Sequence, residues 1–89
     1  MTWTIEFEQA AAKEFKKLDP ATRRRIRAYF EQRVLGPQGP RAHGKPLKGA
    51  LAGFRRYRIG NYRVVCRIED ERLIVLIVRV AHRKAVYDS

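Results

Sequence analysis

The sequence has almost no cysteine, no long hydrophobic run and, over a long central stretch, no acidic residue. Its single cysteine, Cys66, cannot form an internal disulfide, and its strand-like surroundings predict a small core side chain rather than a nucleophile. The longest apolar run, Leu73 to Val78, is far shorter than the roughly 18 residues that span a membrane. The chain opens on a strand pattern instead of a secretory signal. We therefore expect one cytoplasmic domain over residues 1–89, with no membrane partner.

The charge of the chain is strongly one-sided. Twenty Lys and Arg oppose nine Asp and Glu, which gives a formal net charge of +11. The stretch between Glu31 and Glu69 has no acid but contains the basic residues Arg33, Arg41, Lys45, Lys48, Arg55, Arg56, Arg58, Arg63 and Arg67. Such a surface repels itself unless an anion meets it. Nucleic acid is the leading candidate, whereas an anionic membrane would favour an amphipathic basic helix.

The amino-terminal half predicts one strand and a helical hairpin. Residues 3–7 alternate apolar and polar side chains, which is typical of a half-buried strand, and residues 7–18 then carry apolar side chains at helical spacing. Asp19 and Pro20 are typical of the N-cap and first turn of a second helix. The glycine- and proline-rich segment 36–40 stops that helix.

The second helix carries a basic cluster of Arg23, Arg24, Arg25 and Arg27, which lies mostly away from its apolar stripe. Two interpretations stay open. The cluster is either a solvated helix face, which is the more ordinary case, or an interaction surface.

The carboxy-terminal half predicts an antiparallel meander with strands over residues 54–59, 62–68 and 73–80. Turn signals at Gly60-Asn61 and Asp70-Glu71 separate them. The fold class is therefore α+β with the order β-α-α-β-β-β, an antiparallel sheet with the two-helix hairpin packed on one face. The other face is then open to a partner. The last strand is apolar on both faces and should be central.

A two-residue turn at Gly60-Asn61 places arginines together on one face of the meander. Arg58 then lies opposite Arg63, and the same face carries Arg56 and Arg67. Like charges opposite one another destabilise a hairpin, so we expect a solvated basic face that binds phosphates, which suit the planar fork of arginine. An acidic helical peptide would fit the same face, and arginines splayed into water are the structural alternative. Arg79 could join this face or pair with an acid such as Glu6.

The tail is where chemistry could reside. His82 and Tyr87 can carry protons, and Arg83 can stabilise charge on a phosphorane-like transition state. RNA cleavage by its own 2′-hydroxyl needs these three kinds of group, and it needs neither a metal nor another cofactor. His43 and His82 are far apart in the sequence and acids are scarce, so no metal site is expected. Each residue alone is more often a packing or surface residue.

Two stretches resemble the RelE/ParE toxin superfamily. The central one runs Leu47-Lys48-Gly49 and then Phe54-Arg55-Arg56-Tyr57-Arg58-Ile59-Gly60-Asn61-Tyr62-Arg63-Val64-Val65. It is similar to the Arg-x-Arg-x-Gly-Asp-Tyr-Arg run and hydrophobic strand of that family, with Asn61 in place of the usual Asp. The tail Val80-Ala81-His82-Arg83-Lys84-Ala85-Val86-Tyr87 resembles the RelE-like ending. The resemblance covers nearly the whole chain.

This resemblance implies the toxin of a type II toxin–antitoxin pair. RelE-like members bind the ribosomal A site and cut messenger RNA there, by attack of a 2′-hydroxyl on the adjacent phosphate. The products are a 2′,3′-cyclic phosphate and a free 5′-hydroxyl. A RelB-like antitoxin wraps the toxin and blocks its groove, and larger toxin–antitoxin complexes form on operator DNA.

The resemblance also implies roles for single residues. Arg63 matches an arginine that grips the phosphate, and Arg83 matches one proposed as acid or charge stabiliser. Tyr87 matches the tyrosine that activates or orients the nucleophile. Lys45 and Lys48 fall where basic residues touch ribosomal RNA.

The sequence departs from the family pattern at Arg56 and Arg58, where lysines are common. Arginine stays protonated and does not serve as a general base. Any proton transfer by those lysines would pass here to Tyr87 or His82, and general acid–base help is worth roughly 10²–10⁴ in rate.

Two alternatives stay open beside the ribonuclease. A ParE-like toxin would poison DNA gyrase without cutting RNA, and a degenerate member would bind only its antitoxin or RNA. The tail residues His82, Arg83 and Tyr87 favour the ribonuclease. The fold does not separate these functions.

Overall fold

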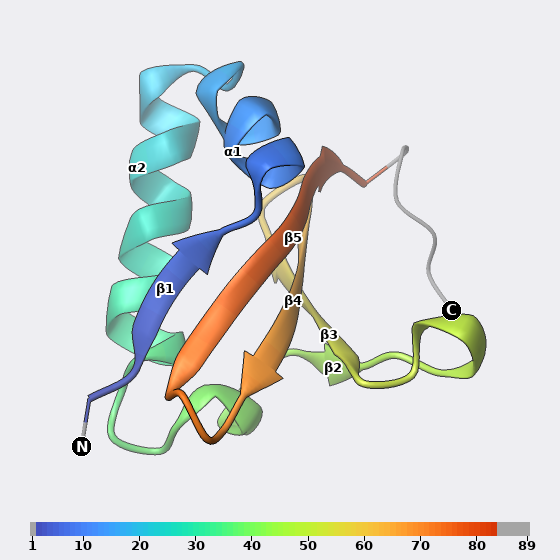
Figure 1. Ribbon diagram of the computed structural model, residues 1–89. Helices are drawn as coiled ribbons and strands as arrows, with labels where there is room; N and C mark the ends of the chain where they lie inside the picture. The colour runs from blue at the N-terminus through green and yellow to red at the C-terminus, as the bar shows by residue number, and fades with distance from the viewer. Residues whose placement is uncertain (1, 84–89) are drawn as a thin grey trace.

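The computed structural model describes residues 2–83 and has two layers, a five-stranded sheet and a helical hairpin on one of its faces (Figure 1). The strands are β1 (Thr4–Phe7), β2 (Lys45–Pro46), β3 (Phe54–Ile59), β4 (Tyr62–Glu69) and β5 (Ile74–His82), in the spatial order β1-β5-β4-β3-β2. The helices are α1 (Gln9–Lys16) and α2 (Pro20–Tyr29), followed by the short helical turns η1 (Phe30–Val34), η2 (Pro40–Ala42) and η3 (Gly49–Leu51). The α+β class and the covering hairpin are confirmed, and β5 is central as predicted.

The sheet is mixed, so the prediction of an antiparallel sheet holds only in part. β3, β4 and β5 form the predicted antiparallel meander. β1, however, runs parallel to β5, with Thr4 opposite Ile74 and Phe7 opposite Ile77. Period-two patterning identifies a strand but carries no information about its direction relative to a strand distant in the chain.

The second helix begins as predicted, and its helical run stops just before segment 36–40, also as predicted. Asp19 caps it, since its Oδ2 accepts a hydrogen bond from Thr22 N at 3.1 Å, and Pro20 occupies the first turn. α2 continues directly into the π turn η1, in which Phe30 and Val34 are buried in the core. No helix among residues 2–83 is long and apolar enough to cross a membrane.

The core lies between the helices and one face of the sheet. Its buried side chains are Ala11, Phe15, Ile26, Phe30, Val34, Tyr57, Ile59, Val64, Cys66, Val75, Ile77 and Val80. Cys66 is fully buried, as predicted for a core side chain, and this burial raises the pKa of its thiol. Among residues 2–83 no helix covers the opposite face of the sheet, and Arg56, Arg58, Arg63, Arg67 and Arg79 lie on that face.

Candidate nucleic-acid interface

The open side of the sheet forms an arginine face, which we define by Lys45, Arg56, Arg58, Arg63, Arg67 and Arg79. The strand register assembles it. Arg58 lies opposite Arg63, as predicted, and Arg56 lies opposite both Val65 on β4 and Lys45 on β2. Opposed residues in a ladder point to the same side of a sheet, so Lys45 joins the face through β2, a strand that the sequence did not predict.

The arginine face is only partly solvated, which corrects the expectation of a wet basic face. Arg58 is exposed, but Arg56 and Arg63 keep only 3% and 8% of their surface. Both residues are flanked by strands on two sides. Arg56 on β3 lies between β2 and β4, and Arg63 on β4 lies between β3 and β5. Arg58 lies beyond the end of β2 and stays open. The face therefore offers buried guanidiniums with an exposed one beside them.

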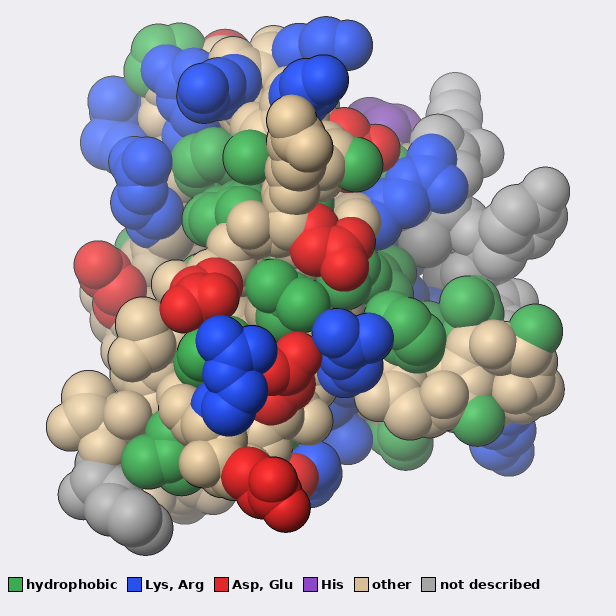
Figure 2. Space-filling model, viewed as in Figure 1, with side chains coloured by type: hydrophobic (Ala, Val, Ile, Leu, Met, Phe, Trp, Pro, Cys, Tyr) green, Lys and Arg blue, Asp and Glu red, His purple; other side chains and the backbone are tan. Residues whose placement is uncertain are grey.

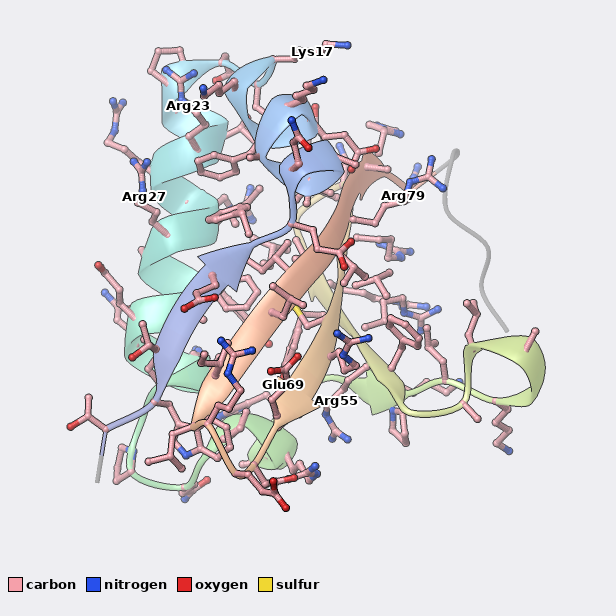
Figure 3. The ribbon with its side chains drawn as sticks, in the orientation of Figure 1. Lys17, Arg23, Arg27, Arg55, Glu69 and Arg79 are labelled. Carbon is pink, nitrogen blue, oxygen red and sulfur yellow. The ribbon has the colours of Figure 1, made fainter. Side chains whose placement is uncertain are left out.

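Arg67 belongs to a different part of this face. Its Nε and Nη2 donate to Glu69 Oε2 at 3.3 and 3.2 Å, and Glu69 also binds Arg72 at 2.8 Å. Figure 3 places Glu69 near the base of the sheet, away from Arg79. The positive charge of Arg67 is partly neutralised, so the structure does not group it electrostatically with Arg58 and Arg63.

Arg79 lies on the arginine face, because it is opposite Val65 in the register. Its acidic partner is Glu14 of α1, with Arg79 Nε 3.4 Å from Glu14 Oε2, and not Glu6 as the sequence suggested. Both sequence alternatives thus hold in part: Arg79 is ion-paired and still points to the open side of the sheet (Figure 3).

The loop before β2 is held in place by hydrogen bonds from Arg55 and Tyr57 of β3, two residues whose role the sequence did not reveal. Arg55 Nε donates to His43 O at 2.6 Å, and its Nη2 donates to Arg41 O at 2.9 Å. The buried Tyr57 hydroxyl donates to Pro40 O at 2.7 Å. These bonds fix residues 40–43 against β3 and so set the position of Lys45 beside Arg56.

Glycine is needed in the same loop. Gly44 has a φ of +76°, and a Cβ there would lie 2.7 Å from both the Tyr57 ring and Arg56 O. A larger residue would be strained and would clash with backbone. The approach of the loop to β3 therefore depends on the absence of a side chain.

A bidentate ion pair ties this loop to the β4–β5 turn. Arg41 Nη1 and Nη2 donate to the two carboxylate oxygens of Asp70 at 2.7 and 2.8 Å. These bonds hold the pKa of the Asp70 carboxyl below its usual value and raise the pKa of Arg41. The pair is exposed and is screened by salt.

The end of β5 separates the predicted tail residues. Tyr62 lies opposite His82, and their rings meet edge to face with centroids 5.5 Å apart. This register puts His82 on the helix-bearing side of the sheet, the side opposite Arg63. Arg83 follows, with its backbone N–H donating to Asn61 O at 2.8 Å, next to the row of Arg58 and Arg63.

Two predicted residues lie elsewhere. Lys48 is exposed at the start of η3, beyond β2 and off the sheet. Tyr87 lies outside the described residues. Among residues 2–83, no three His, Cys, Asp or Glu side chains gather in a way that could hold a metal ion.

Comparison with known proteins gives a consistent set of relatives. A family model described as ParE toxin of type II toxin-antitoxin system, parDE, matches residues 5–87. Toxin RelG of Mycobacterium tuberculosis is 38% identical, with 98% of each chain covered, and mRNA interferase toxin RelE of Escherichia coli is 27% identical over 94% of this chain and 86% of the relative. In the crystal structure of the toxin-antitoxin complex RelBE2 from Mycobacterium tuberculosis, one chain matches with a TM-score of 0.82, 34% identity and 93% coverage of both chains.

Proposed function

The chain belongs to the family of ParE toxins of type II toxin–antitoxin systems, and from this premise we propose that it is a ribosome-dependent endoribonuclease that cuts messenger RNA in the A site. In this proposal it acts in the cytoplasm, where ribosomes are, and a RelB-like antitoxin restrains it. Larger complexes of toxin and antitoxin would form on operator DNA.

The observation that carries the proposal is the convergence of cations at one end of the arginine face. Arg58 and Arg63 face each other across β3 and β4, and the hydrogen bond from Arg83 N to Asn61 O brings the Arg83 backbone to the adjoining turn. Guanidiniums hold phosphates with paired hydrogen bonds and stabilise developing negative charge. A phosphodiester lying across this end would meet cations from three segments of the chain.

The proposed reaction forms a bond between the 2′-oxygen and phosphorus and breaks the bond between phosphorus and the 5′-oxygen. The 2′-hydroxyl proton passes to a general base, and a general acid protonates the leaving 5′-oxygen. Arg63 would grip the phosphate and Arg83 would stabilise the charge of the transition state. Arg56 and Arg58 would bind without proton transfer, because arginine stays protonated.

Proton transfer falls to Tyr87 and His82 in this scheme. His82 packs against Tyr62 on the helix-bearing side. It would therefore have to reach the phosphate from the side of the sheet opposite Arg63. We therefore assign activation of the nucleophile to Tyr87, and His82 is the second candidate for proton transfer. Lys45, Lys48 and Arg67 would contact RNA outside the cleaved bond, and no metal takes part.

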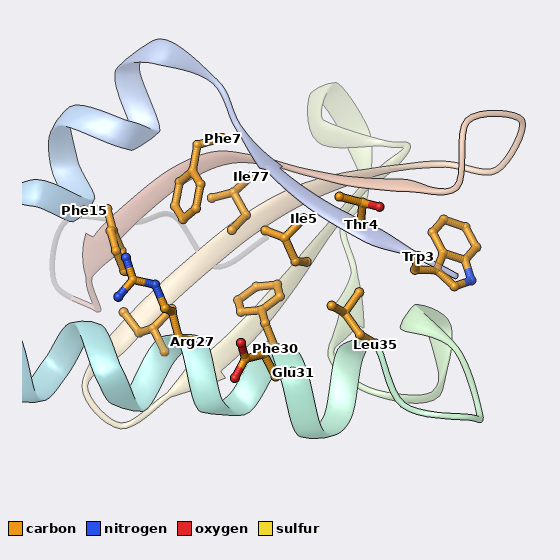
Figure 4. A pocket seen from close by; sticks show the side chains of 11 residues that line it. Trp3, Thr4, Ile5, Phe7, Phe15, Arg27, Phe30, Glu31, Leu35 and Ile77 are labelled. Carbon is orange, nitrogen blue, oxygen red and sulfur yellow. The ribbon is translucent and has the colours of Figure 1, made fainter. Parts of the chain in front are cut away.

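The antitoxin has a suitable surface on the other side of the molecule. A groove of about 340 Å³ runs between β1 and α2 (Figure 4), and its walls include Trp3, Ile5, Phe30 and Leu35. β1 is an edge strand whose outer side has no partner strand among the described residues. An acidic, amphipathic antitoxin segment would bury this apolar groove and offset the +11 charge.

The test is cleavage of a defined message on programmed ribosomes. The expected result is a cut within the A-site codon that requires ribosomes and leaves a 2′,3′-cyclic phosphate. Arg83→Ala and Tyr87→Phe should slow the cut by roughly 10²-fold or more, while the exposed control Arg33→Ala should cut like the wild type. Antitoxin binding should persist in all of these variants.

A second function is supported by the family description, which names ParE. If wild-type protein leaves the message intact at concentrations that stop growth, the ribonuclease proposal is wrong. Inhibition of purified DNA gyrase by the same protein would then identify the target, and the arginine face would be a binding surface only.

A further inference from the structure

The outer edge of β1 is unpaired and carries no cation, although the protein as a whole is strongly basic. We propose that two copies of the chain pair through this edge, with β1 of one copy antiparallel to β1 of the other and a two-fold axis at Ile5. This inference goes beyond the proposed function and does not depend on the cleavage of RNA. An antitoxin segment in the groove beside β1 would exclude the second copy, so the dimer is a state of the toxin without antitoxin.

The backbone of β1 offers hydrogen-bonding groups at this edge. Thr4 N donates to Leu73 O at 2.9 Å, and further along the strand Glu8 N donates to Ile77 O at 2.8 Å. The even-numbered residues therefore turn their backbone groups toward β5, and those of the odd-numbered residues point to the outer edge. No strand pairs with that edge among residues 2–83. An open edge of this kind is a template for another strand.

The sequence of β1 is complementary to itself about Ile5, as a two-fold interface requires. An axis there sets Ile5 against Ile5 of the other copy, and Trp3 against Phe7. These three side chains are apolar and half-buried, and they line the groove between β1 and α2 (Figure 4). Apolar and aromatic cross-strand pairs stabilise a sheet. On the other face the exposed Thr4 would meet the exposed Glu6, so no like charges oppose each other.

Charge favours this edge as the place where two copies meet. Residues 2–12 contain two Glu and neither Lys nor Arg, whereas the whole chain has a net charge of +11. Figure 2 shows Lys and Arg side chains gathered mainly at the top of this view, with Asp, Glu and hydrophobic side chains over the middle of the molecule. Two such basic chains repel each other, and the repulsion is smallest where the facing segments carry no cation.

The groove adds an apolar component to the pairing. Its volume is about 340 Å³, and Phe30 and Leu35 lie on the wall opposite β1. Trp3 and Leu35 also border a second hollow of about 390 Å³, which Pro37 lines. An exposed apolar surface of this kind marks an interaction site. In the dimer, the β1 side chains of the other copy would lie across the mouth of the groove and remove it from water.

The dimer would leave the arginine face free. A two-fold axis between antiparallel strands is perpendicular to the sheet, so both arginine faces would lie on one side of a continuous sheet that combines the five strands of each copy. The arginine face is built on β2, β3, β4 and β5, and β1 lies between those strands and the axis. The paired edge and the arginine face therefore share no residue.

The experiment is sedimentation equilibrium of nuclease-treated toxin, purified without antitoxin, over a range of concentrations. Thr4→Glu and Thr4→Lys are matched variants at one exposed position. In the proposed register Thr4→Glu sets Glu against Glu6 twice, by symmetry, and Thr4→Lys sets Lys against Glu6 twice. The double variant Thr4→Glu with Glu6→Lys restores two pairs of opposite charge. Circular dichroism and thermal unfolding check that all variants keep the fold.

We expect the mass to rise with concentration from that of one chain to that of two. Salt should strengthen the association, because it screens the repulsion between the copies. Thr4→Glu should weaken the dimer roughly threefold or more, Thr4→Lys should tighten it by a similar factor, and the double variant should bind at least as tightly as wild type. Net charge alone predicts the reverse for the single variants, since Thr4→Glu lies one unit below +11 and Thr4→Lys one unit above it.

A cysteine at the axis tests the register directly. Two copies of Ile5→Cys would face each other with their Cα atoms about 5.5 Å apart, a separation that a disulfide spans. The native Cys66 is buried and does not compete. Thr2→Cys is the control, because position 2 would face Glu8 and its own two copies would lie about 20 Å apart. Mild oxidation should cross-link Ile5→Cys into a dimer and leave Thr2→Cys as one chain.

The other outcomes overturn the inference. It is wrong if the mass stays that of one chain and Ile5→Cys does not cross-link. If Thr4→Glu and Thr4→Lys shift the association in the same direction, the copies meet through another surface. If the association weakens with salt, residual RNA bridges the copies. If wild type stays monomeric and the antitoxin alone covers β1, this edge is an antitoxin site only. None of these results depends on whether the protein cuts RNA.

Discussion

Glu14 on α1 accepts a hydrogen bond from the backbone N–H of Val80 at 2.7 Å, across 66 residues of chain. β1 pairs with β5 only as far as Ile77, so the rest of that edge of β5 has no partner strand among residues 2–83. Glu14 Oε1 takes the place of a strand carbonyl there, while its Oε2 lies 3.4 Å from Arg79 Nε. One carboxylate therefore extends the sheet edge and orients an arginine of the open face.

The first prediction concerns this carboxylate. Glu14→Ala should lower the free energy of unfolding by about 1–3 kcal/mol, because the partly buried Val80 N–H loses its acceptor. Glu14→Gln keeps an oxygen acceptor and should lose less than half as much. Urea unfolding of both variants measures the difference. Equal losses would mean that the charge on Glu14, and not its hydrogen bond to Val80, is what stabilises the fold.

The second prediction concerns the loop that positions Lys45. Arg55→Lys keeps the charge but cannot reproduce a fork that reaches both His43 O and Arg41 O. The loop should open more often, so limited trypsin digestion should cut after Arg41 several times faster, as read by mass spectrometry. The control Arg58→Lys should leave that rate unchanged. A loop equally resistant in both variants would show that Tyr57 and Asp70 suffice to hold it.

The third prediction is a dependence of stability on pH. The bonds from Arg41 lower the pKa of Asp70 in the folded protein. The ionised Asp70 carboxylate therefore stabilises the fold fully above the pKa of Asp in the unfolded chain, about 3.9. This stabilisation disappears as the pH falls through the pKa of Asp70 in the folded protein. Asp70→Asn should therefore be less stable than wild type near neutral pH and equally stable in strong acid. Added salt should narrow the gap at neutral pH. A gap that persists in acid would contradict the ion-pair explanation.

Local chemistry made part of this molecule predictable. Asp19 and Pro20 mark the start of α2 by neighbouring residues alone. The two-residue turn at Gly60-Asn61 fixes the register of β3 against β4, and hence the pairing of Arg58 with Arg63. Each of these features depends on residues close together in the sequence.

The faces of β5 could not be predicted, because a bulge changes them. The register shifts between Val65 and Cys66, and Val78 is the extra residue on β5. A shift of one residue turns a side chain to the other face of a sheet. It brings Arg79 to the arginine face and puts His82 against Tyr62. The direction of β1 and the bonds of Arg55 likewise depend on segments far apart in the chain.

The last prediction uses Arg58 and Arg63, which oppose each other across the β3–β4 hairpin. Like charges in this position repel, and a Glu at position 58 would face the guanidinium of Arg63 instead. Arg58→Glu should therefore raise the free energy of unfolding by about 0.2–1 kcal/mol, while it weakens RNA binding and slows cleavage. Arg58→Gln should fall between Arg58→Glu and wild type on both measures.

The diagnostic result for Arg58→Glu is a gain in the free energy of unfolding together with a loss of affinity for RNA. If Arg58→Glu stabilises the protein and RNA binding is unchanged, Arg58 does not contact RNA. A position that loses both would mean that Arg58 stabilises the hairpin through contacts other than charge. If Arg58→Glu is more stable and binds RNA more weakly, the repulsion between Arg58 and Arg63 destabilises the free protein and is offset when a phosphate binds between them.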